Sequence, residues 1–292
     1  MLVWNDGQAG TIGGGRLEFE SVERARRALS AGDRFDRIPL GPALGQCCGG
    51  TVQLVTEIWD ADRLASIEGG WHARPLPGTK TPMPLKMAGV LRAARAGQGK
   101  VTTTMVQGWI AEPVSEPDMP VWIWGAGHVG RAIVSVLAPM PSVSLTWVDD
   151  APTRFPGTAP EGVTILPARD MPAAMRLAPA HAHHLFLTYS HEIDLALCHA
   201  ALTHGFASCG LIGSATKWAR FRKRLAQLGH SDARISGITC PIGDPGLGKH
   251  PQAIAVGVAA SLLKQQRQEQ PGLFEPGGKD MTKDIGQTRG AS

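Results

Sequence analysis

The stretch of sequence that decides the fold is VWIWGAGHVG, residues 121–130. Four apolar residues suited to a buried strand lead directly into the glycine pattern G-x-G-x-x-G and then into a helical pattern. This order of strand, loop and helix is typical of the first βαβ unit of a Rossmann-type domain. Gly125 permits the tight turn, Gly127 lets backbone approach a phosphate, and Gly130 lets the helix pack closely on the strand. The stretch therefore predicts a phosphate-binding loop.

Two acids, Asp149 and Asp150, end the next apolar run, about 20 residues further on. A carboxylate at this place accepts hydrogen bonds from the hydroxyl groups of a bound ribose. His128, at the expected helix start, is open to two interpretations, because it could donate to a phosphate or cap the helix. The glycines also allow a second interpretation, in which they permit close packing and no nucleotide binds.

Outward from this loop, residues 121–266 alternate short apolar runs with helical patterns. Such alternation predicts an α/β domain, a Rossmann-type parallel sheet with helices on both faces. Strands are expected at 121–124, 144–148, 163–166, 184–188 and 207–212, and helices at 128–137, 192–204, 214–228 and 251–266.

Ser214 and Lys217 follow the strand expected at 207–212, so they belong to the carboxyl edge of the sheet, where ligands of open α/β sheets bind. Ser214 is either a cofactor-binding residue or the cap of the next helix, and Lys217 is either a phosphate partner or a solvated charge. The histidines within 181–184 are interpreted as a polar loop, because their spacing and the lack of a C-x-x-C pair do not favour zinc.

Residues 1–110 are expected to form a smaller N-terminal α+β domain. A short strand at 2–4 followed by Asn-Asp-Gly predicts a hairpin, and apolar spacing predicts a helix at 16–30. Alternation predicts a strand at 51–58, and four prolines between 75 and 84 predict a loop. Prolines and acids without periodicity make 111–120 a linker, and the polar, glycine-rich residues 267–292 are predicted to be a disordered tail.

The string GQCCGG, residues 45–50, places Cys47 and Cys48 between glycines. A thiolate here could bind a soft metal or carry a persulfide, whereas the alternative is that both cysteines are small buried hydrophobes. The chain has five cysteines, an odd number, and their spacing does not suggest a disulfide framework. A reducing cytoplasm is therefore the expected location.

Composition narrows the classes of function. The chain is 43% hydrophobic and 18% charged, which is typical of a globular protein, and its net charge is only +4. The basic run at 220–224 lies in a helical pattern and is interpreted as a solvated face, so nucleic acid is not expected as a partner. No apolar run reaches the length of a membrane span, so no membrane association is expected.

Several strings, taken together, resemble the XdhC/CoxI family of xanthine dehydrogenase accessory proteins. They are GTIGGGRLE (10–18), GQCCGG (45–50), GAGHVG (125–130), GLIGS (210–214) with Lys217, and CPIG (240–243). They follow the family's order and cover most of the chain up to its tail. The double cysteine and the GGGRLE segment are the most specific, because many enzymes share the glycine pattern. Family members usually carry a further strand before the residue that is Met1 here, so the N-terminal domain would begin without its first strand.

The resemblance implies a chaperone without turnover of its own that binds and protects the molybdenum cofactor. Such a protein receives the cofactor from synthesis proteins, supports its sulfuration by a cysteine desulfurase and delivers it to apo xanthine dehydrogenase. It would act as a homodimer. Cys47 and Cys48 would then contact molybdenum or carry a persulfide, and the glycine loop would hold the phosphate of the cofactor.

Two other functions stay open from the residues alone. The Rossmann-type half by itself suggests an NAD(P)-dependent oxidoreductase, in which His191 could transfer a proton. A redox-sensing scaffold would instead use Cys47 and Cys48 as its reactive thiols.

Overall fold

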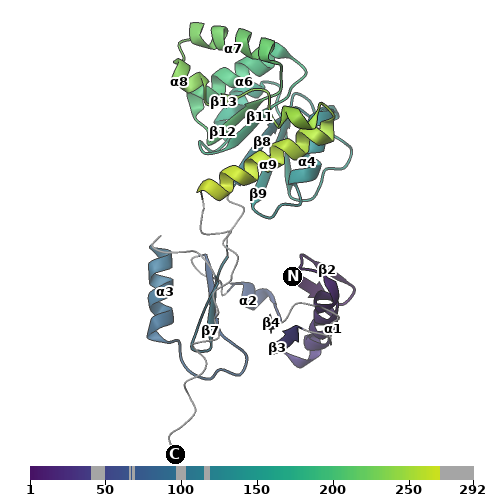
Figure 1. The fold of residues 1–292 in the computed structure, drawn as a ribbon, viewed down its shortest axis with the longest axis vertical. Coiled ribbons are helices and arrows are strands. Elements are labelled where there is room, and N and C mark those ends of the chain that lie inside the picture. Colours follow the sequence, from purple (N-terminus) through teal and green to yellow (C-terminus); the bar gives the residue numbers. More distant parts are fainter. Residues whose placement is uncertain (41–49, 66, 68–69, 97–102, 115–118, 270–292) are drawn as a thin grey trace, which may run out of the picture. The chain divides into compact units, whose positions relative to one another are not determined.

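The structure is a computed structural model that describes residues 1–40, 50–65, 67, 70–96, 103–114 and 119–269. The described residues up to Val114 form one compact unit and those from Met119 onward form a second (Figure 1). Each unit is described here by itself. Within the described ranges, no helix combines the length and the apolar character needed to cross a bilayer.

The C-terminal unit is built on one sheet of six strands whose neighbours all run parallel. The strands are β8 (Met119–Trp124), β9 (Val143–Asp149), β10 (Val163–Pro167), β11 (His183–Phe186), β12 (Ser208–Leu211) and β13 (Ile238–Thr239). Their spatial order is β10-β9-β8-β11-β12-β13, which is the 3-2-1-4-5-6 order of a Rossmann fold. The predicted fold class is thereby confirmed, and the switch point of the sheet lies between β8 and β11.

Helices cover both faces of this sheet (Figure 1). They are α4 (His128–Leu137), α5 (Met171–Ala174), α6 (His191–His204), α7 (Ala215–Gln227), α8 (Asp232–Ile235) and α9 (Pro251–Glu269). Helix α4 packs against α9 on one face, and α5 and α6 pack together on the other. The four helices predicted from the sequence are all present, whereas the four-residue helices α5 and α8 and the two-residue strand β13 were not predicted.

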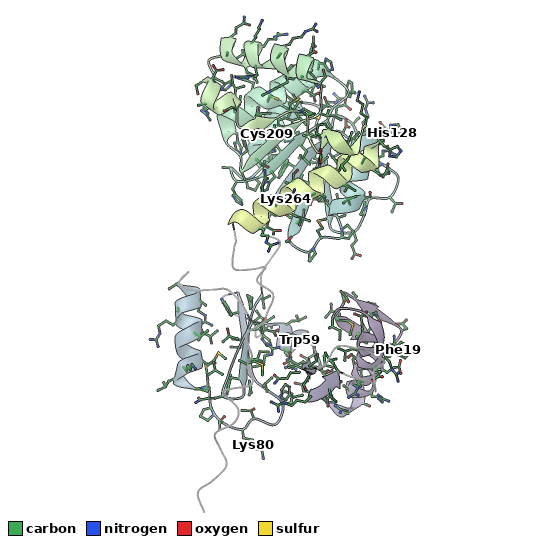
Figure 2. All side chains as sticks on the ribbon, viewed as in Figure 1. Phe19, Trp59, Lys80, His128, Cys209 and Lys264 are labelled. Atoms are coloured by element: carbon green, nitrogen blue, oxygen red, sulfur yellow. The ribbon has the colours of Figure 1, made fainter. Side chains whose placement is uncertain are left out.

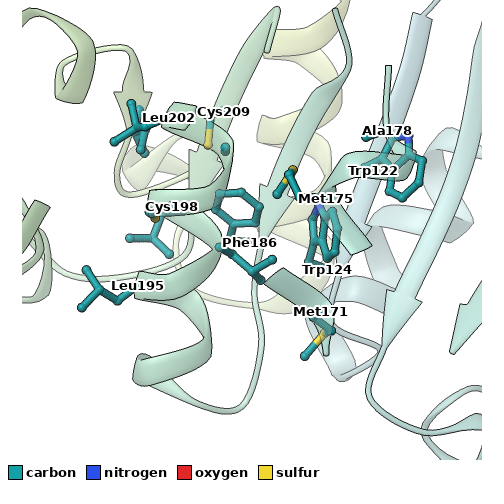
Figure 3. Close-up of a cluster of buried hydrophobic side chains, with 14 of the residues drawn as sticks. Trp122, Trp124, Met171, Met175, Ala178, Phe186, Leu195, Cys198, Leu202 and Cys209 are labelled. Atoms are coloured by element: carbon teal, nitrogen blue, oxygen red, sulfur yellow. The ribbon is translucent and has the colours of Figure 1, made fainter. Parts of the chain in front are cut away.

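Strand β8 shows why both faces are covered. Val121 and Ile123 are buried in the cluster that includes α4 and α9. Trp122 and Trp124 alternate with them and are buried in the opposite cluster, among side chains of α5 and α6 (Figure 3). Since side chains alternate along a strand, a strand that is apolar at every position must be covered on both sides.

One sequence interpretation is wrong in this unit. His183 and His184 are not in a polar loop but are buried in β11, with 3% and 0% of their surfaces exposed, although the strand predicted at 184–188 already included His184. His184 accepts a hydrogen bond at Nδ1 from Trp124 Nε1 at 3.2 Å, and His183 Nδ1 lies 2.8 Å from Ser208 Oγ. These polar partners on neighbouring strands let the two imidazoles occupy a position that an apolar pattern alone would not indicate.

The N-terminal unit contains three small antiparallel sheets, β1-β2, β3-β4 and β5-β7-β6, together with three helices among its described residues. The elements are β1 (Leu2–Trp4), β2 (Gly7–Ala9), α1 (Gly15–Ala31), β3 (Arg34–Leu40), β4 (Gly50–Thr56), α2 (Ala61–Ala65), β5 (Trp71–Pro75), α3 (Leu85–Arg95), β6 (Thr104–Val106) and β7 (Trp109–Pro113). The first hairpin, the helix predicted at 16–30 and the strand predicted at 51–58 are confirmed.

The segment predicted as a linker, 111–120, differs from that prediction at both ends. Its first residues belong to β7, and its last two begin β8. Proline is tolerated there because Pro113 and Pro120 stand near strand ends, where a missing donor matters least. Cys47, Cys48 and the tail from residue 270 lie outside the described residues.

Candidate functional site

The glycine loop joins β8 to α4 at the carboxyl end of the sheet. Gly125 has a φ of 123°, and a Cβ on it would lie 2.4 Å from the carbonyl oxygen of Leu187. A Cβ on Gly130 would lie 2.1 Å from the carbonyl oxygen of Gly125. Glycine is therefore required at these two positions by the fold itself, as close contact of helix and strand demands.

Gly127 differs from its two neighbours in the motif. Its φ of −73° and ψ of −172° are open to any residue, and a Cβ on it would meet nothing within 4 Å. Protein packing thus does not explain the glycine, which leaves open space before the first backbone N–H groups of α4. Those groups have no partners within the helix, and together with the helix dipole they favour an anion.

His128 is the first residue of α4 and lies exposed on the surface of the C-terminal unit (Figure 2). Its side chain makes no cap: the N-cap residue is Gly127, and α4 has no side-chain cap hydrogen bond. Of the two interpretations of His128, capping is therefore not what the structure shows.

Asp149 at the end of β9 is bound to the glycine loop. Its Oδ2 accepts a hydrogen bond from the backbone N–H of Ala126 at 2.5 Å, and its Oδ1 accepts one from the N–H of Asp150 at 2.7 Å. Burial raises the pKa of the Asp149 carboxyl, against the lowering effect of these two N–H groups. Oδ2 therefore holds the glycine loop, and Oδ1 is engaged by the peptide that follows β9.

Asp150 is the more accessible of the two acids. It accepts hydrogen bonds from the hydroxyl of Tyr189 at 2.7 Å and from Nε of Arg154 at 3.1 Å. The Tyr189 hydroxyl is the main cause that lowers the pKa of Asp150. Asp150 also lines an open cavity of about 630 Å³, together with Arg154, Arg169 and two neighbouring residues. An acid and two guanidinium groups thus stand beside the end of β9.

Tyr189 was not singled out from the sequence as a site residue. It is the single tyrosine of the chain, follows β11 and is 63% exposed, and the Arg154 guanidinium lies 4.5 Å from the centre of its ring. The signal available in the sequence was the position of Tyr189 after a strand, at the carboxyl edge of the sheet. Its hydrogen-bond partner Asp150, however, lies 39 residues away in sequence.

Ser214 and Lys217 occupy a second place on the carboxyl edge. Ser214 Oγ accepts a hydrogen bond from the backbone N–H of Lys217 at 3.2 Å, which confirms the predicted helix cap. Lys217 Nζ lies 2.7 Å from Oδ2 of the fully buried Asp194 and donates to the Ile212 carbonyl at 2.9 Å. Lys217 is therefore neither a solvated charge nor a cation left open for phosphate, because the ion pair uses it.

Asp149 thus contacts the glycine loop directly, because it accepts a hydrogen bond from Ala126 N–H. Asp150 is connected to the loop only through Asp149, which accepts a hydrogen bond from the Asp150 backbone N–H. Cys47 and Cys48, predicted for the same site, lie outside the described residues. In the part of the chain that the structure describes, no group of three or more His, Cys, Asp or Glu side chains could hold a metal ion.

The strand order and the glycine loop define the C-terminal unit as a Rossmann-type domain. The family model described as the XdhC Rossmann domain matches residues 121–262, and the model of the XdhC and CoxI family matches residues 1–38. The chain belongs to the XdhC and CoxI family, as the sequence motifs predicted.

Solved structures add likeness of fold. A Bacillus halodurans protein described as a xanthine dehydrogenase has a TM-score of 0.64 and 18% identity, over 90% of this chain and 84% of that one. The Escherichia coli tRNA N6-threonylcarbamoyladenosine dehydratase TcdA scores 0.38 with 15% identity, over 52% of this chain and 88% of that one. A Rossmann-fold NAD(P)-binding family protein from Shigella flexneri scores 0.34 with 14% identity, over 56% and 96%. No curated protein matches this sequence.

Proposed function

We propose that this chain is a maturation factor of xanthine dehydrogenase that binds the molybdenum cofactor and delivers it to the apoenzyme. The proposal combines the family with one observation, the open space in front of Gly127. The cofactor carries a phosphate, and the backbone N–H groups at the start of α4 form a place suited to an anion. The residues present therefore fit the phosphate end of the cofactor.

The chain's own residues have separate tasks in this account. Gly127 leaves room for the phosphate, and Asp149 holds the Ala126 peptide so that the loop keeps its shape. Asp150, which is bound by the exposed side chains of Tyr189 and Arg154 and lines the cavity, is the acid that the hydroxyl groups of a ribose would reach in a dinucleotide form of the cofactor. When bound, the cofactor supplies a molybdenum centre whose oxo ligand can be exchanged for a sulfido ligand.

Cys47 and Cys48 stay a proposal from the sequence. A thiolate between glycines offers the soft sulfur ligand that molybdenum accepts, or a carrier for a persulfide from a cysteine desulfurase. Assembly as a homodimer in the cytoplasm and contacts with the proteins of cofactor synthesis belong to the same proposal. In this account the chain holds and transfers the cofactor and catalyses no turnover.

The test is anaerobic incubation of the full-length protein with molybdenum cofactor, followed by desalting and measurement of bound molybdenum and pterin. We expect about one cofactor per chain, and we expect Cys47→Ala or Cys48→Ala to retain less. Cys240→Ala is the control, since burial raises the pKa of that thiol and makes it a poor ligand. Wild-type protein that retains no cofactor would contradict the proposal.

An NAD(P)-dependent oxidoreductase is the second candidate, because Asp150 and the adjoining cavity suit a nucleotide ribose. Its possible proton-transfer residue, His191, opens α6 at the carboxyl edge, where its ring lies 6.5 Å from that of Phe221. The two functions separate in one experiment. Binding and turnover of NAD(H) by protein that retains no cofactor would support the oxidoreductase.

A further inference from the structure

A large cavity lies within the N-terminal unit. Its volume is about 1160 Å³. One wall is the sheet β5-β7-β6, whose other face is covered by Met87 and Leu91 of α3. Residues of β1, α1 and β4, together with Ile12 and residues 57–59, form the rest of the lining. We call this space the N-terminal cavity.

Three charged side chains line the N-terminal cavity, and its single guanidinium is already engaged. Arg74 donates from Nε to Glu57 Oε1 at 2.8 Å and from Nη2 to Glu57 Oε2 at 2.5 Å. Its Nη2 also lies 2.5 Å from Glu112 Oε2, and its Nη1 donates to the His72 carbonyl. Because Arg74 is only 10% exposed and its donors face these acceptors, it is poorly placed to receive an anionic ligand.

Glu112 is the group that faces outward. Its side chain is 39% exposed, and only Oε2 is used, by Arg74. Among the described residues, Oε1 has no hydrogen-bond partner. The cavity therefore offers a ligand a charged acceptor and selects for groups that donate hydrogen bonds.

The remaining lining is largely apolar and includes two large rings. Trp4 is 47% exposed and Trp59 is 37% exposed. The Trp59 ring has two neighbours, because the Arg63 guanidinium lies 5.1 Å from its centre and the His72 ring lies 4.8 Å away. Exposed indole faces bind flat rings by stacking.

We infer that the N-terminal cavity binds a planar heterocycle of the 2-aminopyrimidin-4-one class, with the amino group and the ring N–H directed at Glu112. Two adjacent N–H donors match a carboxylate, and an apolar space with indole rings suits the flat ring. Pterins and guanine share this edge. The inference rests on the proposed function where it names pterin as the member of the class, and it concerns the N-terminal unit by itself.

Three phosphate-free probes test the inference on the full-length wild-type protein. They are 6-hydroxymethylpterin, the corresponding 6-hydroxymethyllumazine, which has a carbonyl in place of the amino group, and guanosine. Quenching of tryptophan fluorescence and calorimetry report their binding. We expect the pterin to bind about 10-fold tighter than the lumazine, because a carbonyl facing Glu112 replaces a charge-assisted hydrogen bond. Equal affinity of the two, or no binding by any probe, would overturn the inference.

The variant Glu112→Gln tests the same contact by changing the protein in place of the ligand. An amide is a weaker acceptor and presents its own donors, so the preference for pterin over lumazine should fall to less than about 3-fold. Arg74 keeps its two bonds to Glu57, and the fold should persist, as a melting curve would show. Glu23→Gln is the matched control, because Glu23 lies on α1, pairs with Arg26 and does not line the cavity. An unchanged preference in Glu112→Gln would contradict the assigned contact.

The probes also separate this inference from the proposed function. None of them carries a phosphate, so their binding does not depend on the glycine loop. Guanosine bound in preference to the pterin would support the Glu112 contact and count against a pterin as its ligand. Cofactor retained by wild-type protein that binds no probe would overturn the inference and leave the proposed function supported.

Discussion

The carboxylate of Asp149 accepts a hydrogen bond from the backbone N–H of Ala126 at 2.5 Å, which ties the end of β9 to the loop after β8. The carboxylate of Asp149, which ends β9, is therefore bound by the backbone of the protein itself. The sequence predicts one shared role for Asp149 and Asp150, the binding of ribose hydroxyls, whereas the structure separates the two acids. Asp149 shapes the glycine loop, and Asp150 faces the adjoining cavity.

Asp149→Asn should therefore destabilise the fold more than Asp150→Asn does. Both oxygens of Asp149 accept from backbone N–H groups, and an asparagine replaces one acceptor with a donor that faces a donor. We expect a loss of about 1–3 kcal/mol in the free energy of unfolding. Asp150, whose partners Tyr189 and Arg154 are exposed, should lose no more than about 1 kcal/mol. Urea denaturation measures both, and equal losses would contradict the division of roles.

Two glycine substitutions should change stability in opposite directions. Gly130→Ala places a Cβ 2.1 Å from the Gly125 carbonyl oxygen, so the loop or α4 must move, at about 3 kcal/mol or more. Gly89→Ala, in the middle of α3, meets nothing within 4 Å and should stabilise by about 0.5–1 kcal/mol. Thermal unfolding of both variants checks the pair. A Gly130→Ala variant as stable as the wild type would show that α4 does not pack on the glycine loop as described.

Much of the C-terminal unit could be predicted because its signals are local. The glycine loop, the four long helices and the strand β8 each lie within one short, strongly patterned stretch. The acceptor that fixes Lys217 could not be predicted, because Asp194 lies 23 residues earlier on a different helix. The sequence leaves Lys217 as a phosphate partner or a solvated charge, and only the fold shows the buried ion pair.

In the N-terminal unit, strand β5 shows why prediction fails. Its buried residues include His72 and Arg74, so the alternation of the strand is polar on one side and gives no apolar signal. Arg74 is stabilised there by Glu57, which directly follows β4, and by Glu112 of β7, and these acids are 17 and 38 residues away. The charged wall of the N-terminal cavity is accordingly visible only in three dimensions.

Acid should destabilise the C-terminal unit through His184. Burial lowers the pKa of this histidine from 6.5 to about 3, so the folded protein holds it neutral while the unfolded chain takes up a proton. The stabilisation is complete above about pH 6.5 and is lost as the pH falls toward 3. At about pH 4.5 the loss should reach about 3 kcal/mol.

His184→Asn provides the test, since asparagine can still accept from Trp124 Nε1 but does not titrate. The free energy of unfolding of this variant should depend less on pH between about 4.5 and 6.5 than that of the wild type. His181→Asn, at an exposed position three residues away, is the control and should keep the wild-type slope. Parallel slopes for wild type and His184→Asn would show that His184 is not the source.

The most direct test of the proposed function compares Gly127→Val with Gly157→Val in retention of the molybdenum cofactor. Both glycines have open space where a Cβ would be added, so both variants should fold, as circular dichroism would confirm. Valine at 127 fills the space in front of the N–H groups at the start of α4, whereas valine at 157 lies outside the glycine motif. We expect Gly127→Val to lose at least about 10-fold in affinity, as removal of a charge-assisted contact implies, and Gly157→Val to bind like the wild type. Folded Gly127→Val that binds the cofactor with wild-type affinity would contradict the placement of the phosphate on the glycine loop.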